Sequence, residues 1–190
     1  MKYTRIPETA FQTLQLNAGI LLSDFTPGTA EISEENILGV NFVATPEYSD
    51  FGEDIDNCPV NVMELKKIDS WEVTMSGTFI TVDTALAKRL IGPADIDDSD
   101  STKVVPRNDV LTTDFQDIWW VGDYSDKNGD TNGGYVAIHM LNGLSTGGFQ
   151  IQSNNRGKGQ FEFEFTGHYS IDAQDVVPFE VYIKAGTDEE

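Results

Sequence analysis

The stretch that decides the fold is Gln160-Phe161-Glu162-Phe163-Glu164-Phe165-Thr166, which has an apolar residue at every second position. Strict alternation predicts a β-strand with one face in a core and the other in water, since successive strand side chains point to opposite sides. Residues 71–79 and 177–184 alternate in the same way, and Pro178, which lacks an amide donor, fits a strand start or a sheet edge. Further stretches rich in strand formers lie at 14–22, 37–44, 118–121, 135–141 and 148–152. The chain is therefore predicted to be mainly β.

One short helix is also predicted. Asp83 or Thr84 can cap its first turn, residues 85–91 are good helix formers, and Gly92 followed by Pro93 ends it. A helix of about two turns is not stable alone, so we expect it to pack against the sheet.

Length and charge restrict the possible functions. The 190 residues fit a single domain and carry 12 Lys and Arg against 32 Asp and Glu, a net charge of −20. Since affinity for nucleic acid comes largely from cations that neutralise phosphates, we expect the protein to repel DNA, RNA and anionic lipid. The one cysteine, Cys58, cannot form an intrachain disulfide, and no apolar stretch approaches a membrane span. We expect a soluble protein in a reducing compartment.

Two long acidic segments lie between the predicted elements, at 46–70 and 93–117. Segments this long without regular structure usually serve a function or are mobile. The first also holds apolar side chains that need a place to pack: either they fold back on their own sheet, or they dock on a neighbouring subunit. The candidates for such an inter-subunit arm are Tyr48, Phe51, Val60, Val62, Met63 and Leu65.

A metal site is the first chemical candidate. Asp126, Asn128, Asp130 and Asn132 place oxygen ligands at every second position, the spacing that calcium loops use. The position that should hold a bidentate Glu is His139, however, and the loop joins two predicted strands rather than two helices. A hairpin loop of Asn, Asp and Gly is favoured, with calcium binding as the weaker alternative.

Catalytic candidates are weaker still. Glu162 and Glu164 would lie about 6.6–6.8 Å apart on one strand face, which suits acid–base work in a glycosidase. Any alternating strand with a wet face yields such pairs, however, so a solvated face is favoured. Neither His139 nor His168 accompanies a nucleophile motif. The adjacent residues 119 and 120 are both Trp and could stack on a sugar, but in a strand they point to opposite faces, so one belongs to the core. We expect no enzyme and no cofactor.

Several separated blocks, in order, resemble the major tail proteins of long-tailed bacteriophages and prophages of Firmicutes. The blocks are 48–59, 71–79, 85–92, 105–109, 119–126 and 165–174, and the resemblance extends from about residue 38 to 186. On this resemblance, residues 1–190 are one tail tube domain with an extended arm or loop at about 46–70 and a flexible acidic C-terminal tail at 186–190.

The resemblance implies a β-sandwich or barrel domain with one flanking helix and long loops. Such proteins assemble as hexameric rings that stack into a hollow tube in the virion tail, after synthesis in the host cytoplasm. DNA passes through without specific binding, and the other partners are tail proteins such as the tape measure and terminator. The family has no catalytic residues. We expect an acidic strand face to line the lumen, with Glu72, Glu162 and Glu164 as candidates.

The alternative is a calcium-dependent β-sandwich module that binds carbohydrate or protein through residues 126–132 and Trp119 or Trp120. A glycosidase-like hydrolase using a carboxylate pair is a third interpretation.

Overall fold

The computed structural model describes residues 15, 19–26, 37–124 and 133–186. Its main feature is an antiparallel sheet of eight strands: β1 (Ile20–Leu22), β2 (Ile37–Asp50), β3 (Lys66–Phe79), β6 (Gln116–Tyr124), β7 (Gly134–Ser145), β8 (Gln150–Gln152), β9 (Gln160–Thr166) and β10 (Phe179–Lys184). A second sheet pairs β4 (Ala94–Asp97) with β5 (Asp100–Pro106). The prediction of a mainly β protein is confirmed.

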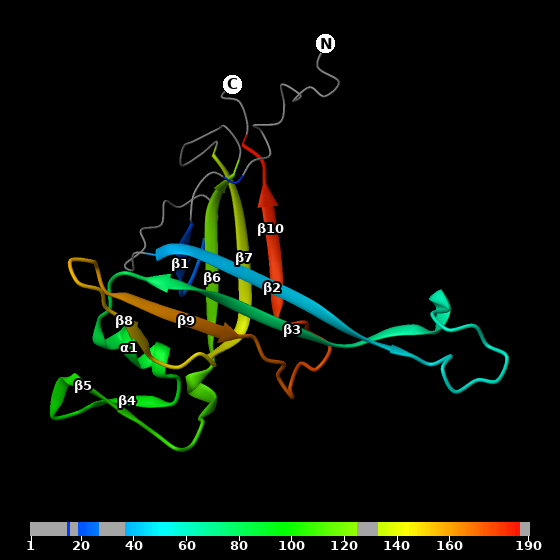
Figure 1. Cartoon of the computed structure of the whole chain (residues 1–190), viewed down its shortest axis with the longest axis horizontal. Coiled ribbons are helices and arrows are strands. Elements are labelled where there is room, and N and C mark those ends of the chain that lie inside the picture. Colours follow the sequence, from blue (N-terminus) through cyan, green and yellow to red (C-terminus); the bar gives the residue numbers. More distant parts are fainter. Residues whose placement is uncertain (1–14, 16–18, 27–36, 125–132, 187–190) are drawn as a thin grey trace, which may run out of the picture.

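The large sheet is folded into two crossing layers (Figure 1). One layer contains β2, β3, β9 and β8, and the other contains β1, β6, β7 and β10. Strand β7 joins them, because its first part pairs with β10 and its end, Leu144 and Ser145, pairs with β9. The sheet is open rather than closed into a barrel, so the barrel part of the fold expectation does not hold for the single chain.

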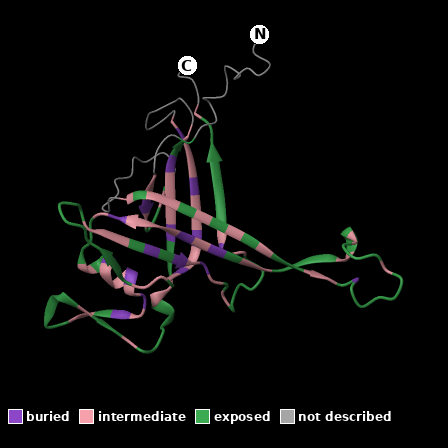
Figure 2. Cartoon of the chain, in the orientation of Figure 1, coloured by how far each residue is buried: buried purple, intermediate pink, exposed green. Residues whose placement is uncertain are grey.

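The core lies between the two layers. Val73, Met75, Phe163 and Phe165 face it from the β2–β3–β9 layer, and Ile118 and Met140 face it from the other. Each of these side chains is less than 5% exposed, and Figure 2 shows the buried residues concentrated where the layers cross. Burial of this kind stabilises the fold by about 1.5–3 kcal/mol per large apolar side chain.

Helix α1 (Thr84–Ile91) begins and ends as the sequence predicts. The Asp83 carboxylate accepts a hydrogen bond of 2.7 Å from the Leu86 amide, so Asp83 rather than Thr84 is the N-cap. At the other end Gly92 adopts a φ of +84°, and its amide donates to the Lys88 carbonyl. Leu86 and Leu90 are buried in the core, so one face of the helix packs against the large sheet.

The second acidic segment, 93–117, is not an irregular loop. It contains β4 and β5, followed by a 3-10 turn at Thr112–Asp114. Arg107 links β4 to the 3-10 turn, since its guanidinium contacts the carboxylate of Asp95 at 2.7 Å and that of Asp114 at 2.5 Å. The strands of this segment were missed in the sequence. Its acidic side chains contact Ser, Lys and Arg of the same segment and do not face a core.

Asp97 at the β4–β5 turn provides a pH-dependent test of this hairpin. The Ser99 hydroxyl, the Lys103 ammonium group and the Ser99 amide donate to its carboxylate, which lowers its pKa from 3.8 to about 2. A lowered pKa means that the charged form stabilises the folded hairpin above about pH 4, and that this stabilisation is lost as the pH falls toward 2.

We therefore expect the Ser99 amide resonance to titrate with a midpoint near pH 2 when followed by NMR from pH 5 to 1.5. The Asp97→Asn variant should lose this transition, because its amide does not ionise. A midpoint near 3.8 in the native protein would contradict the hydrogen-bonded arrangement at the turn.

Of the described residues, no helix has the length and apolar character needed to cross a membrane. The predicted acidic tail at 186–190 lies, apart from Gly186, outside the described residues.

Candidate functional site

The three glutamates named as candidates for a lumen-facing surface lie on one face of the β2–β3–β9 layer. The register pairs Glu162 with Thr78 and Glu164 with Ser76, so both glutamates lie on the same face as the even-numbered residues of β3, which include Glu72. Across β3, Glu72 pairs with Thr45 of β2. The structure therefore brings together Glu72, Glu162 and Glu164, which are far apart in the sequence, on one exposed surface.

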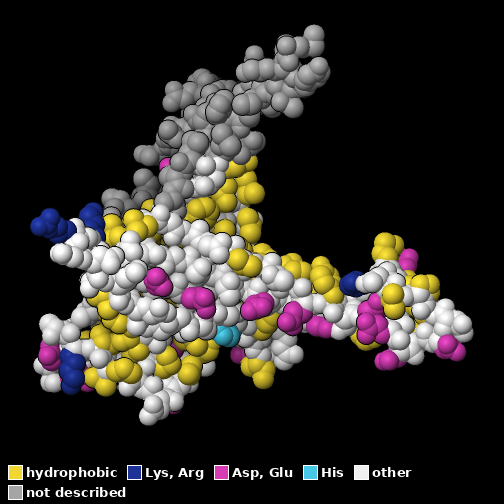
Figure 3. All heavy atoms as spheres, viewed as in Figure 1, with side chains coloured by type: hydrophobic (Ala, Val, Ile, Leu, Met, Phe, Trp, Pro, Cys, Tyr) yellow, Lys and Arg dark blue, Asp and Glu magenta, His cyan; other side chains and the backbone are white. Residues whose placement is uncertain are grey.

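We call this surface the acidic face. Apart from the three glutamates it consists of uncharged residues and one more acid, as the register shows: Asn41, Val43, Thr45, Glu47, Ser70, Thr74, Ser76, Thr78 and Thr166. None of these positions holds Lys or Arg. Figure 3 shows a row of Asp and Glu side chains crossing this side of the molecule toward the arm. The face is therefore polar, with charges of one sign only.

Two carboxylates of the acidic face accept hydrogen bonds from neighbouring hydroxyl groups. Glu164 accepts a hydrogen bond of 3.2 Å from the Thr146 hydroxyl, and Glu47 accepts one of 2.8 Å from Ser70. Both are ordinary surface contacts of exposed carboxylates. Glu47 was missed in the sequence because it was assigned to a loop; its place on the face follows only from the β2–β3 register.

The predicted arm is a long β-hairpin. Strands β2 and β3 are 14 residues each, and their pairing continues from Val40 with Gly77 out to Asp50 with Lys66. Residues 46–50 and 66–70, predicted as part of a long loop, are therefore strand, and only 51–65 connect them. In Figure 1 this hairpin extends from the layered core as a narrow projection.

The six apolar residues predicted for the arm divide into two groups. Tyr48, Phe51, Val60 and Met63 are exposed, Met63 by 80%, whereas Val62 and Leu65 are half-buried within the tip. Ile55 and Ile68, which were not singled out in the sequence, are about half exposed as well. None of the six belongs to the core, so folding back on the parent sheet is excluded as their location. Figure 2 shows the projection as mainly exposed.

The tip is nevertheless an ordered structure held by Asp50. Its carboxylate accepts hydrogen bonds from the amides of Gly52 at 2.9 Å and Asn61 at 2.7 Å, and these bonds lower its pKa below the ordinary value. The Phe51 amide also donates to the Leu65 carbonyl. Asn57 and Asn61 adopt the left-handed conformation, which Asn tolerates better than most residues. The exposed apolar side chains are thus presented on a defined scaffold.

We expect Asp50→Ala to loosen the tip without unfolding the domain. The change leaves the Gly52 and Asn61 amides without their acceptor, so the tip loses local stability. Hydrogen exchange should accelerate at residues 51–65 by about tenfold or more and stay unchanged in β6 and β7. Equal acceleration in both regions would show that the tip is coupled to the core.

The two adjacent tryptophans lie on opposite faces, as predicted. Trp120 packs against the core, whereas Trp119 stacks on His139 with ring centroids 3.9 Å apart and an interplanar angle of 7°. His139 also lies 3.3 Å from the Asp117 carboxylate and 3.5 Å from that of Glu180. The Tyr182 hydroxyl donates to the Glu180 carboxylate, which lowers the pKa of Glu180 below its ordinary value. His168 lies elsewhere and contacts the Asn142 carbonyl at 3.2 Å.

The weak calcium candidate, Asp126, Asn128, Asp130 and Asn132, lies outside the described residues. Within the described part of the chain, no group of three or more His, Cys, Asp and Glu side chains could hold a metal ion.

No protein-family model matches the chain, and no curated protein is significantly similar to it in sequence.

Proposed function

We propose that this protein is a structural subunit that assembles with copies of itself into hexameric rings, and that the rings stack as the tail tube of a long-tailed bacteriophage or prophage. In this proposal the acidic face lines a conduit through which DNA passes, and the arm holds neighbouring subunits together. The protein acts in the virion tail after assembly in the host cytoplasm.

The acidic face is the observation that carries the proposal. DNA is a polyanion, and a wall that holds Lys or Arg would retain it through phosphate contacts. The acidic face presents four glutamates among Ser, Thr and Asn side chains and no cation at the register positions of β2, β3 and β9. Such a surface interacts with water and repels phosphates, which suits passage without binding.

The arm and the sheet edges support the self-assembly part. Exposed apolar groups on an ordered projection are typical of a protein–protein contact, since single chains rarely expose such a patch without a binding partner. Among the described residues, β2 and β10 are also paired on one side only. Closing strands of several subunits into a ring would remove such unpaired edges.

Negative-stain electron microscopy of the purified protein at high concentration tests the proposal. We expect rings or hollow rods whose walls are one subunit thick. Persistent monomers at all concentrations would overturn the proposal, and a gain in thermal stability of those monomers with calcium would favour the binding-module alternative instead.

A further inference from the structure

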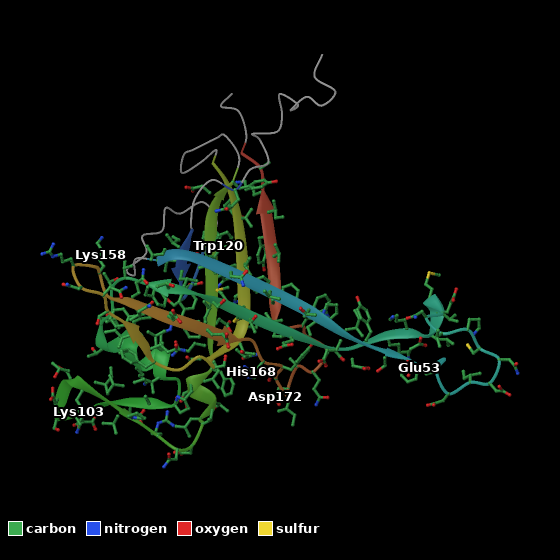
Figure 4. All side chains as sticks on the ribbon, viewed as in Figure 1. Glu53, Lys103, Trp120, Lys158, His168 and Asp172 are labelled. Carbon is green, nitrogen blue, oxygen red and sulfur yellow. The ribbon has the colours of Figure 1, made fainter. Side chains whose placement is uncertain are left out.

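The arm tip and the loop between β8 and β9 lie at opposite ends of the long axis of the molecule. Figure 4 labels Glu53 in the tip at one end and Lys158 in the loop at the other. Because the two segments are separated by the whole layered core, they do not meet within one chain. Two copies placed end to end would bring the tip of one beside the loop of the next.

The tip is acidic as well as apolar. Residues 51–65 contain four acids and no Lys or Arg. Glu53, Asp54 and Asp56 are exposed next to Phe51 and Ile55, which are each more than half exposed. The nearest cations, Lys66 and Lys67, lie at the base of the tip, where each covers an aromatic ring of the arm.

The loop at 153–159 has the complementary composition. It holds Arg156 and Lys158, both exposed, and no acid occurs from residue 148 to 161. Phe149 and Ile151, just before it, are exposed apolar side chains, Ile151 by 61%. Arg156 also adopts a left-handed φ of 63°, which is uncommon for a residue other than Gly or Asn. The loop therefore presents two cations beside an apolar pair.

The other described cations are engaged differently. Lys103 and Arg107 are ion-paired within the β4–β5 region, and Lys88 and Arg89 lie half-buried in the last turn of α1. Lys184 is a single cation on β10. Apart from Lys66 and Lys67 in the arm itself, the loop at 153–159 is the place in the described part of the chain where two exposed cations adjoin exposed apolar side chains.

We propose that the arm tip of one copy, residues 51–65, docks on the basic loop of the next copy, residues 153–159, with Phe149 and Ile151 beside it. The contact joins two different surfaces, so it is heterologous and propagates head to tail until it closes a ring or extends a filament. Copies that carry a charge of −20 repel one another at long range, and a local match of opposite charges selects the productive approach. The inference rests on the proposed self-assembly and names the surface that the arm contacts.

Site-specific cross-linking tests the contact. Cys58 in the tip is the sole cysteine of the chain, so an Asn155→Cys variant has one thiol at each end of the molecule. With a short bismaleimide linker we expect a ladder of covalent dimers, trimers and larger species on denaturing gels. The matched control is Ser101→Cys, an exposed position on β5, which should give no ladder although it also has two thiols.

Charge exchange tests the chemistry of the contact. In the Asn155→Cys background, Arg156→Glu with Lys158→Glu should reduce the cross-linked yield by about tenfold, since like charges then face each other. Adding Glu53→Lys and Asp54→Lys should restore it, because this combination recovers both the opposite charges and the native net charge. An exchange that restores nothing would overturn the electrostatic match.

The outcomes separate this inference from the proposed function. Tubes without an Asn155→Cys ladder would refute the docking surface and leave the tail tube proposal intact. A ladder without rings or tubes would support the docking surface and refute the tube. If neither forms, both proposals fail.

Discussion

A variant in which Asn-Gly replaces residues 51–65 is expected to fold normally and to form no tubes. Asp50 and Lys66 are the last cross-strand pair of the hairpin, so a two-residue turn can join them without changing the register. None of the replaced residues belongs to the core, so the melting temperature should change by no more than a few degrees. The exposed apolar and acidic groups of the tip, in contrast, are all lost.

Circular dichroism would measure the fold of this variant, and electron microscopy with sedimentation would measure its assembly. A control with Val110→Ser and Leu111→Ser removes two exposed apolar side chains from another part of the surface and should still assemble. Tubes formed by the shortened hairpin would refute the role of the arm in assembly.

Reversing the acidic face is expected to leave assembly intact and to block DNA passage. Glu72→Lys, Glu162→Lys and Glu164→Lys place three cations per subunit among Ser and Thr side chains, where no ion pair of a described residue is broken. Each cation can hold a phosphate, and several such contacts together change affinity for DNA by orders of magnitude. We expect the infectivity of a phage carrying this subunit to fall by roughly a hundredfold or more.

Purified tubes allow the same change to be measured directly. Native tubes should not shift DNA on a gel, whereas the reversed tubes should bind it with an affinity that falls steeply with salt. The matched control reverses Asp98, Asp172 and Asp175, three exposed acids outside the acidic face, to Lys. This control changes the net charge equally, so normal infectivity in both variants would count against a lumenal location of the face.

The elements with a strong local signal could be predicted from the sequence. The alternation at Gln160–Thr166 gave β9 with its bounds, and it assigned Phe163 and Phe165 to the core and Glu162 and Glu164 to water. Asp83 and Gly92 gave the bounds of α1 to within a residue, because capping is determined by a few neighbouring side chains.

The outer halves of β2 and β3 could not be predicted in this way. Their residues 46–50 and 66–70 face solvent on both sides of a two-stranded ribbon, so no apolar side alternates with a polar one. Cross-strand hydrogen bonds and pairs such as Asp50 with Lys66 hold them instead, and these interactions leave no period in the sequence.

The candidate surfaces depended on long-range register. The sequence indicated Glu162 and Glu164 as neighbours, since they share a strand. Glu72 was a separate candidate, and its place on the same face, like that of Glu47, follows only from the order β9, β3, β2. The basic loop was not found because two cations among Ser, Asn and Gly look like an ordinary turn. Its significance comes from its position at the far end of the molecule from the arm (Figure 4).

The arm is also built to carry a mechanical load. Strands β2 and β3 each continue from the projection into the layered core, and the register shifts by one residue between Glu47 and Tyr48 near the base of the arm. A pull on the tip therefore acts along the strands and reaches the pairs of β3 with β9, from Thr74 to Phe79. Their hydrogen bonds lie perpendicular to the pull and share it simultaneously in shear, so they do not open one after another. A tube joined by such arms would resist stretching until this ladder and the core beneath it yield together.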